Sequence, residues 1–133
     1  MRTGITVLAT ISATLGPGTI AHADDILAAG SLFGSTAQSR AVCVFYNAGN
    51  TTVTLRGFQI TDPSGTSQTL IINQCGTSPA ALGPRTACGI AAAASNNTSY
   101  SCRVRIVPDK TNVRGVLDMR DTDQNVLATV DLR

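Results

Sequence analysis

The sequence contains no glutamate and no tryptophan, and its only histidine is His22. Histidine is the usual acid–base group of enzymes, because it is the side chain that ionises near neutral pH. A serine or cysteine nucleophile likewise needs a base placed against it. Paired aspartates could still do acid–base work. We therefore expect no enzyme and no cofactor, and keep a hydrolase of unrecognised type only as a third alternative.

Long hydrophobic runs are also absent. The apolar segment 5–15 is about half as long as the ~20 residues that span a bilayer. It is preceded by Arg2 and followed by the small-residue sequence AHA, which ends at Ala23. This order is typical of a cleaved signal peptide. We expect residues 1–23 to be removed, which leaves one domain, 24–133, with no membrane span and a secreted or periplasmic location.

Strong charge is missing as well. Beyond residue 23 there are nine basic residues, eight Arg and Lys110, against eight Asp, so the net charge is +1. No run of Lys or Arg suggests nucleic-acid binding, and export separates the chain from the cytosol. We expect the partner to be a protein or a glycan.

Cysteine is present in an even number. Cys43, Cys75, Cys88 and Cys102 are separated by 32, 13 and 14 positions. Zinc and thioredoxin-like redox sites would need closely spaced pairs, and zinc usually needs histidine. In a small exported domain this pattern predicts two disulfides. Three pairings are open, and we favour Cys75 with Cys88 and Cys43 with Cys102.

Short apolar runs separated by turn residues fill the rest of the chain. The predicted strands are 40–47, 51–62, 68–73, 87–94, 99–107, 113–120 and 126–133. The clearest is 99–107, where apolar and polar residues alternate with the period of a half-buried strand. This spacing predicts an all-β antiparallel sandwich of about seven strands. The segment 26–36 is expected to add an edge strand.

Two of these strands carry a local irregularity. In 51–62 the apolar phase shifts at Gly57, which predicts a β-bulge. The alanine run in 87–94 could also form a helix, but it is too short to be stable alone. We therefore expect a strand there.

Two features resemble immunoglobulin-like domains. Tyr100 precedes Cys102 by two residues, as in the tyrosine corner of those domains, and Cys43 is then placed to bridge the two sheets. The tryptophan of antibody-type domains is missing. The segment 75–88, which reads C-G…L-G-P…A-C, resembles the C-G…L-x-P-G-x-x-C turn of bacterial Hydin/ASH-type domains, with Gly-Pro in place of Pro-Gly.

The whole of 24–133 resembles small secreted bacterial proteins of unknown function. The shared residues are R-A-x-C at 40–43, Y-N-A-G at 46–49 and V-R-G-x-L at 113–117. This resemblance implies an immunoglobulin-like fold and export, and it carries over no catalytic residue.

A candidate anion-binding patch lies on the strand 99–107. Arg103 and Arg105 share its outward face, and we expect Arg114 on a neighbouring strand. Guanidinium groups suit carboxylate and phosphate. The alternative is a solvated sheet face on which these arginines pair with Asp118 or Asp131.

A weak calcium candidate lies in the turn before the last strand. Asp121, Asp123 and Asn125 match the first three oxygen-ligand positions of a calcium loop. Val126 occupies the position of the expected glycine, and Leu132 that of the closing acid. The alternative is an ordinary hairpin turn, and we expect no metal.

The function that these features favour is a non-catalytic binding or structural module. The second alternative is a self-assembling surface or pilus-like subunit, in which the segment 26–36 pairs with the sheet edge of a neighbouring copy. The third, a hydrolase, predicts a concave pocket where Asp and Arg side chains converge.

Overall fold

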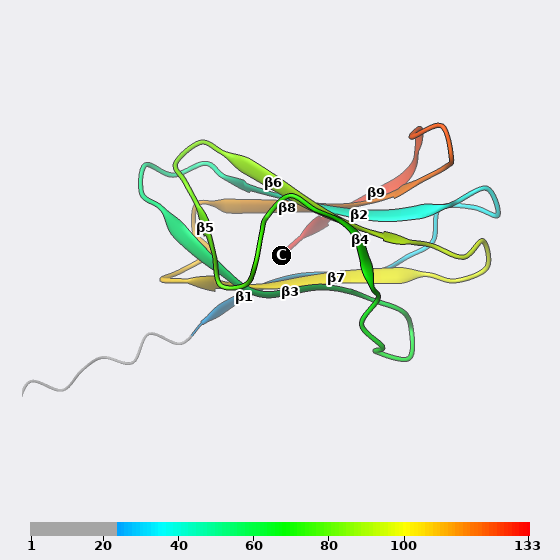
Figure 1. The fold of residues 1–133 in the computed structure, drawn as a ribbon, viewed down its shortest axis with the longest axis horizontal. Coiled ribbons are helices and arrows are strands. Elements are labelled where there is room, and N and C mark those ends of the chain that lie inside the picture. The colour runs from blue at the N-terminus through cyan, green and yellow to red at the C-terminus, as the bar shows by residue number, and fades with distance from the viewer. Residues whose placement is uncertain (1–23) are drawn as a thin grey trace, which may run out of the picture.

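Two antiparallel β-sheets packed face to face make up the computed structural model, which describes residues 24–133 (Figure 1). The strands are β1 (Asp25–Leu32), β2 (Arg40–Asn47), β3 (Val53–Thr61), β4 (Leu70–Asn73), β5 (Ala80–Leu82), β6 (Ala87–Ala93), β7 (Tyr100–Val107), β8 (Val113–Arg120) and β9 (Val126–Leu132). One sheet has the order β1-β7-β3-β5 and the other β4-β6-β2-β8-β9. The predicted all-β antiparallel sandwich is confirmed. The expected signal peptide lies outside the described residues.

All seven expected strands are present, with two more. β1 is an edge strand in the expected segment, and it pairs with β7 of its own chain. β5 is the strand that the sequence did not predict, because three residues in a Gly- and Pro-rich segment carry no readable alternation. The alanine run forms a strand, β6, whose Ile90 and Ala92 are fully buried. Residues 24–133 contain no helix long and apolar enough to cross a membrane.

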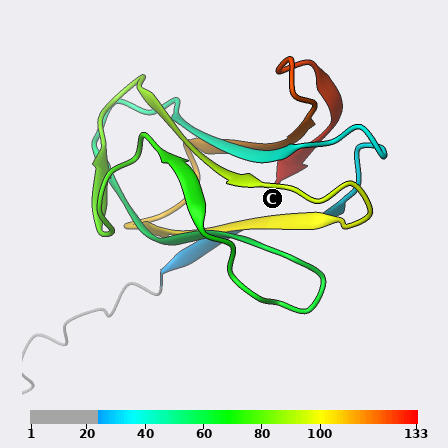
Figure 2. The ribbon, with the colours of Figure 1, turned by 45° about the vertical axis from the view of Figure 1, so that its right-hand side comes forward.

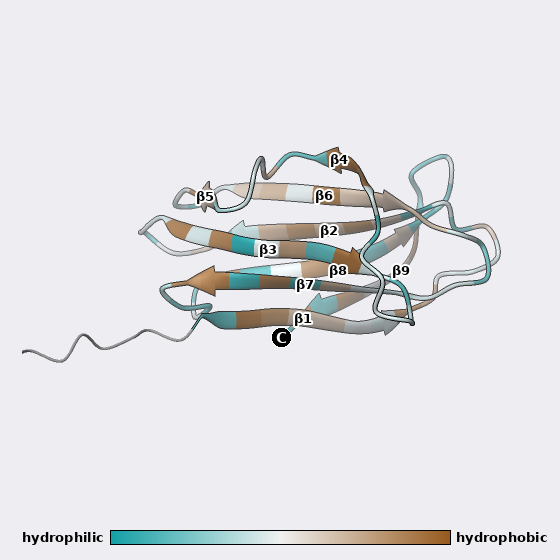
Figure 3. Cartoon of the chain, turned by 60° about the horizontal axis from the view of Figure 1, so that its bottom comes forward, coloured by the Kyte–Doolittle hydropathy of each residue, from teal (hydrophilic) through white to brown (hydrophobic). Residues whose placement is uncertain are grey.

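The core lies between the sheets and follows from the period of the strands. On β7, Tyr100, Cys102, Val104 and Ile106 are buried, while the two arginines between them are exposed. Figure 3 shows the same alternation of hydrophobic and hydrophilic residues along β3 and β7. Alternate residues of a strand point to opposite faces, so each strand supplies one apolar row to the core.

Both disulfides of the favoured pairing are present. Cys43 on β2 and Cys102 on β7 join central strands of opposite sheets, with their Cα atoms 6.4 Å apart and both residues buried. Cys75 and Cys88 are bonded with a sequence separation of 13 and tie the segment after β4 to β6. The first bond holds the sheets together and the second closes a loop at their edge.

The predicted bulge in β3 is confirmed. The pairing of β3 with β7 changes register between Arg56 and Gln59. Gly57 lies inside this irregularity with φ of 53°, a conformation that favours glycine.

The two flanks of the sandwich differ. On one flank Ala28 of β1 and Arg133 exchange two backbone hydrogen bonds, of 3.1 and 3.0 Å, so the first strand meets the end of the last. The other flank consists of the short strands β4 and β5. Figure 2 shows the loop between β3 and β4, in green, projecting away from the sheets. The sheets are therefore closed on one side and open on the other.

Candidate functional site

Three exposed arginines gather on the outward face of the four-stranded sheet. Arg103 and Arg105 are alternate residues of β7, and Arg56 on β3 lies directly opposite Arg105. Alternate residues are about 7 Å apart along a strand, and neighbouring strands are about 5 Å apart. We call these three residues the arginine face.

Among the described residues, no acidic side chain forms an ion pair with the arginine face. Beside Arg103 lie Ala28 of β1 and Gln59 of β3, and beside Arg105 lies Ile26 of β1. Within residues 24–133 the three guanidinium groups form no ion pair and no hydrogen bond. Like charges directly opposite each other destabilise a sheet. A bound anion would remove this repulsion.

The prediction that Arg114 belongs to this patch is wrong. The residues after β7 cross to the other sheet, so β8 pairs with β2, and Arg114 lies opposite Tyr46. Its Nη1 donates to the backbone oxygens of Thr111 and Val113, at 2.9 and 3.0 Å. Pairing between distant strands is not encoded locally, which is why the sequence misplaced this residue.

The acidic residues that were predicted to pair with the patch lie on the other sheet, for the same reason. Asp118 is on β8 and Asp131 on β9, both in the five-stranded sheet, so neither faces Arg103. The residue that the sequence missed is Arg56. Its strand was predicted, but the phase shift at Gly57 hid which face it occupies.

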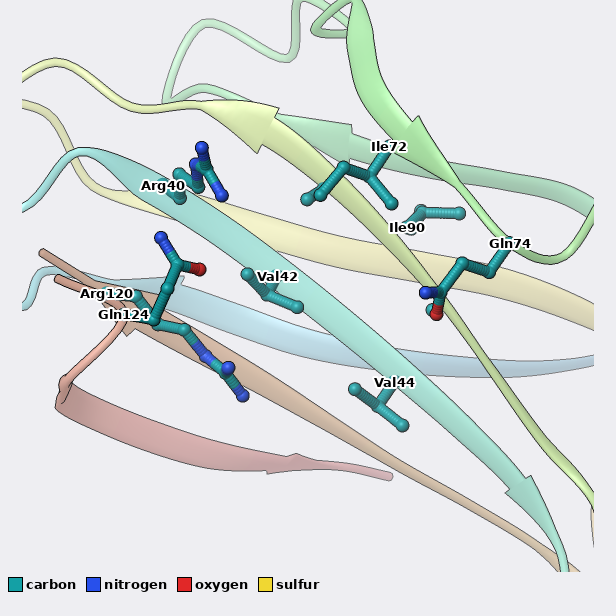
Figure 4. A pocket seen from close by; sticks show the side chains of 10 residues that line it. Arg40, Val42, Val44, Ile72, Gln74, Ile90, Arg120 and Gln124 are labelled. Atoms are coloured by element: carbon teal, nitrogen blue, oxygen red, sulfur yellow. The ribbon is translucent and has the colours of Figure 1, made fainter. Parts of the chain in front are cut away.

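A groove lies in the outward face of the five-stranded sheet (Figure 4). Its volume is about 230 Å³, and its floor is Gly89 and Ala91 of β6. Ile72 of β4 forms one wall, and Val42 and Val44 of β2 form the other. We call this hollow the β6 groove. Arg40, Arg120 and Gln124 gather at one end of it in Figure 4, and Gln74 lies at the other.

The two arginines at the groove differ in their partners. Nη2 of Arg120 lies 2.7 Å from Oδ2 of Asp118, whose Oδ1 accepts a 2.8 Å hydrogen bond from Thr129. Arg40 lies directly opposite Arg120, and in the described part of the chain its guanidinium has no partner. Nε of Arg120 is buried without a hydrogen-bond partner. One uncompensated positive charge therefore remains at this end.

The cysteines and Tyr100 are used inside the fold. All four cysteines are oxidised, so the described residues contain no free thiol. The hydroxyl oxygen of the buried Tyr100 accepts a 2.9 Å hydrogen bond from the backbone N–H of Ser95, five residues upstream. Gln38, also buried, donates from Nε2 to the backbone oxygens of Ser95 and Thr98. These groups fix the loop before β7.

In the calcium candidate, the carboxylate of Asp121 accepts hydrogen bonds from residues of its own turn. Oδ1 of Asp121 accepts the backbone N–H groups of Asp123 and Asn125, each at 2.9 Å, and Oδ2 accepts Nδ2 of Asn125. These bonds, the Asn125 side chain most of all, hold the pKa of Asp121 below its ordinary value. Residues 24–133 contain no group of three or more His, Cys, Asp or Glu side chains that could hold a metal. The arrangement fits a hairpin turn.

The hydrolase alternative predicted converging Asp and Arg side chains. Arg114 and Asp131 both line an open hollow of about 160 Å³, but among the described residues no Asp lines the β6 groove, which is lined by Arg40 and Arg120. The groove therefore offers positive charge and apolar walls rather than an acid–base pair.

Compared with known proteins, the chain matches no family model, no curated protein and no solved structure. Fold class alone does not specify function. The function must therefore be argued from the surfaces of the molecule.

Proposed function

We propose that this protein is an exported, non-catalytic binding module whose arginine face recognises an anionic polymer. The observation that carries the proposal is the gathering of Arg56, Arg103 and Arg105 on one sheet face without an ion-pair partner in residues 24–133. Planar guanidinium groups bind carboxylate, sulfate and phosphate through paired hydrogen bonds. The chain's two disulfides indicate an oxidising, extracytoplasmic compartment. The secreted or periplasmic location and the immunoglobulin-like kinship are parts of this proposal.

The partner is a polymer because the arginines are spread over a surface. All three arginines are exposed, and their backbone positions are about 5–7 Å apart, so a single small anion bound among them stays in contact with water. Single exposed contacts contribute only about 0–1 kcal/mol. A chain with repeated carboxylates can occupy the three positions together, which favours an acidic glycan over a small solute. Such binding weakens with salt, because exposed charges are screened.

The test uses residues 24–133 and polygalacturonate, with neutral dextran as the uncharged control polymer. Binding is measured by isothermal titration calorimetry at low salt and again at high salt. The variant R56Q/R103Q/R105Q is expected to bind at least about tenfold more weakly. The matched control R85Q/R114Q/R133Q removes the same number of charges elsewhere and is expected to bind as the parent does.

Two results would overturn the proposal. Equal losses in both triple variants would mean that the polymer responds only to net charge. Equal binding of dextran and polygalacturonate would mean that the arginines do not recognise the anionic groups.

A further inference from the structure

We propose that the β6 groove binds a small carboxylate with an apolar tail, such as a medium-chain fatty acid. This site is on the five-stranded sheet, opposite the arginine face, and does not depend on the function proposed above. The inference rests on the shape of the groove, on the chemistry of its walls and on one unpaired charge at its end.

The shape follows from side-chain size along β6. Its outward residues are small, with Gly89 and Ala91 at the groove, while Ile72 on one side and Val44 on the other are large. The side chain of Gln74 folds over the glycine, since a Cβ placed there would lie 3.4 Å from its Oε1. A trough with apolar walls therefore runs along one strand between its two neighbours. Ile72 remains 39% exposed, so the trough opens to solvent.

The volume limits the size of the ligand. At about 230 Å³ the groove is smaller than the ~300–1,000 Å³ of sites for drug-sized molecules. We therefore expect the part of the ligand that lies in the groove to be small, on the order of ten non-hydrogen atoms. A short alkyl chain would cover the apolar side chains of Val42, Val44 and Ile72 and remove them from water.

The charge at the end of the groove identifies the head group. The charge of Arg120 is offset by Asp118, but that of Arg40, directly opposite, is not. Gln124 reaches the same end, and its Nε2 makes only a long, 3.5 Å hydrogen bond to Thr122. A carboxylate lying here can accept hydrogen bonds from the Arg40 guanidinium and the Gln124 amide. A neutral head group would leave the charge of Arg40 unpaired.

The backbone of the turn holds Gln124 in place. Its φ is 69°, in the left-handed region that glycine adopts more readily than other residues. Gln124→Gly therefore removes the amide while suiting the backbone, which makes it a variant that keeps the fold.

The experiment titrates residues 24–133 with sodium octanoate, followed by calorimetry and by amide chemical shifts. Octanol tests the contribution of the carboxylate, and acetate that of the tail. We expect octanoate to shift the amides of Gly89, Ala91 and Val44 and to bind at least about tenfold more tightly than either comparison compound. Octyl sulfate tests whether the head group must be a carboxylate. If it binds as tightly as octanoate, the site selects an anionic head group of either kind, and the assignment of a carboxylate is overturned.

The variants locate the site. Arg40→Met is expected to weaken octanoate at least about tenfold, Gln124→Gly to weaken it less, and Arg114→Met, a matched control on the same sheet outside the groove, to leave it unchanged. Thermal melting checks that each variant is folded. The proposal is overturned if octanol binds as tightly as octanoate, if octanoate does not bind at about 10 mM, or if the control loses as much affinity as Arg40→Met. If Arg40→Met does not fold, unchanged affinity in Gln124→Gly is the contradicting result.

Discussion

At the scale of single residues, one carboxylate organises the loop after β3. Oδ1 of Asp62 accepts the hydroxyl of Ser64 at 2.6 Å and the backbone N–H groups of Ser64 and Thr66 at 2.9 and 3.0 Å. Bonds to a charged group favour its charged form. The pKa of Asp62 is therefore lowered, with the Ser64 hydroxyl as the largest cause. A lowered carboxyl pKa stabilises the fold above the ordinary value of 3.8, and this contribution is lost as the pH falls below it.

The first prediction concerns the hydrogen bond from the Ser64 hydroxyl to Asp62. Ser64→Ala removes the largest contribution, so the pKa of Asp62 is expected to rise toward 3.8. The measurement is an NMR titration of the side-chain carboxyl carbon. Ser67→Ala, a neighbouring serine that makes no hydrogen bond to this carboxylate, is the control. An unchanged pKa in the Ser64 variant would contradict the assignment.

A second residue-scale prediction compares the two tyrosines. Tyr100→Phe removes the hydrogen bond between the hydroxyl of Tyr100 and the backbone N–H of Ser95, which is part-buried, so the unfolding free energy is expected to fall by about 0.5–1.5 kcal/mol. Tyr46 is 40% exposed, so Tyr46→Phe is expected to change stability by less than about 0.5 kcal/mol. Urea unfolding measures both. Equal losses in the two variants would show that the hydrogen bond of Tyr100 does not stabilise the fold.

At the scale of strands, the position of most strands could be predicted from local patterns, but the pairing between strands could not. The phase shift at Gly57 predicted the bulge, because alternation of apolar residues reports directly on the backbone. The neighbours of β7 could not be predicted in this way, because β1 and β3 are far from it in sequence. The placement of the residues was accordingly correct for Arg103 and Arg105, which share a face, and wrong for Arg114, since Arg56 lies beside them instead.

The bulge gives a prediction with a matched control inside the chain. A Cβ added at Gly57 or at Gly30 would meet nothing within 4 Å, but only Gly57 has a positive φ. Gly57→Ala is therefore expected to lower the unfolding free energy by about 1 kcal/mol through the backbone alone. Gly30→Ala is expected to be neutral or slightly stabilising. Chemical denaturation checks both, and a reversed order would contradict the bulge geometry.

At the scale of the whole molecule, the disulfides could be predicted from spacing, compartment and the absence of histidine. The strand β5 could not, because it is held by pairing with Val53, Thr54 and Leu55 of β3 rather than by its own pattern. The β6 groove could not be predicted either. It depends on β4 and β2 both lying beside β6, which sequence order does not reveal.

The two crosslinks are expected to contribute unequally. On the loop-entropy account, the Cys43–Cys102 disulfide, with a sequence separation of 59, adds about 4 kcal/mol to the unfolding free energy. The Cys75–Cys88 disulfide, with a separation of 13, adds about 3 kcal/mol. Replacing Cys43 and Cys102 by alanine also leaves space in the core. We therefore expect that double variant to be the less stable in urea. The opposite order, or peptide mapping that links Cys75 to Cys102, would contradict this account.

The closed flank of the sandwich has a consequence for how copies could join. Ala28 is already bonded to Arg133, and the Lys110 ammonium donates to the backbone oxygen of Ile26, so three backbone groups on the outer edge of β1 are occupied. A neighbouring copy that added a strand to β1 would have to displace these bonds, whereas on the other flank β4 and β5 are edges of the two sheets. A molecule with a single interface for copies of itself forms only dimers, since a fibre needs a second, complementary interface on every copy. If contact between copies is confined to the flank of β4 and β5, we therefore expect pairs rather than polymers.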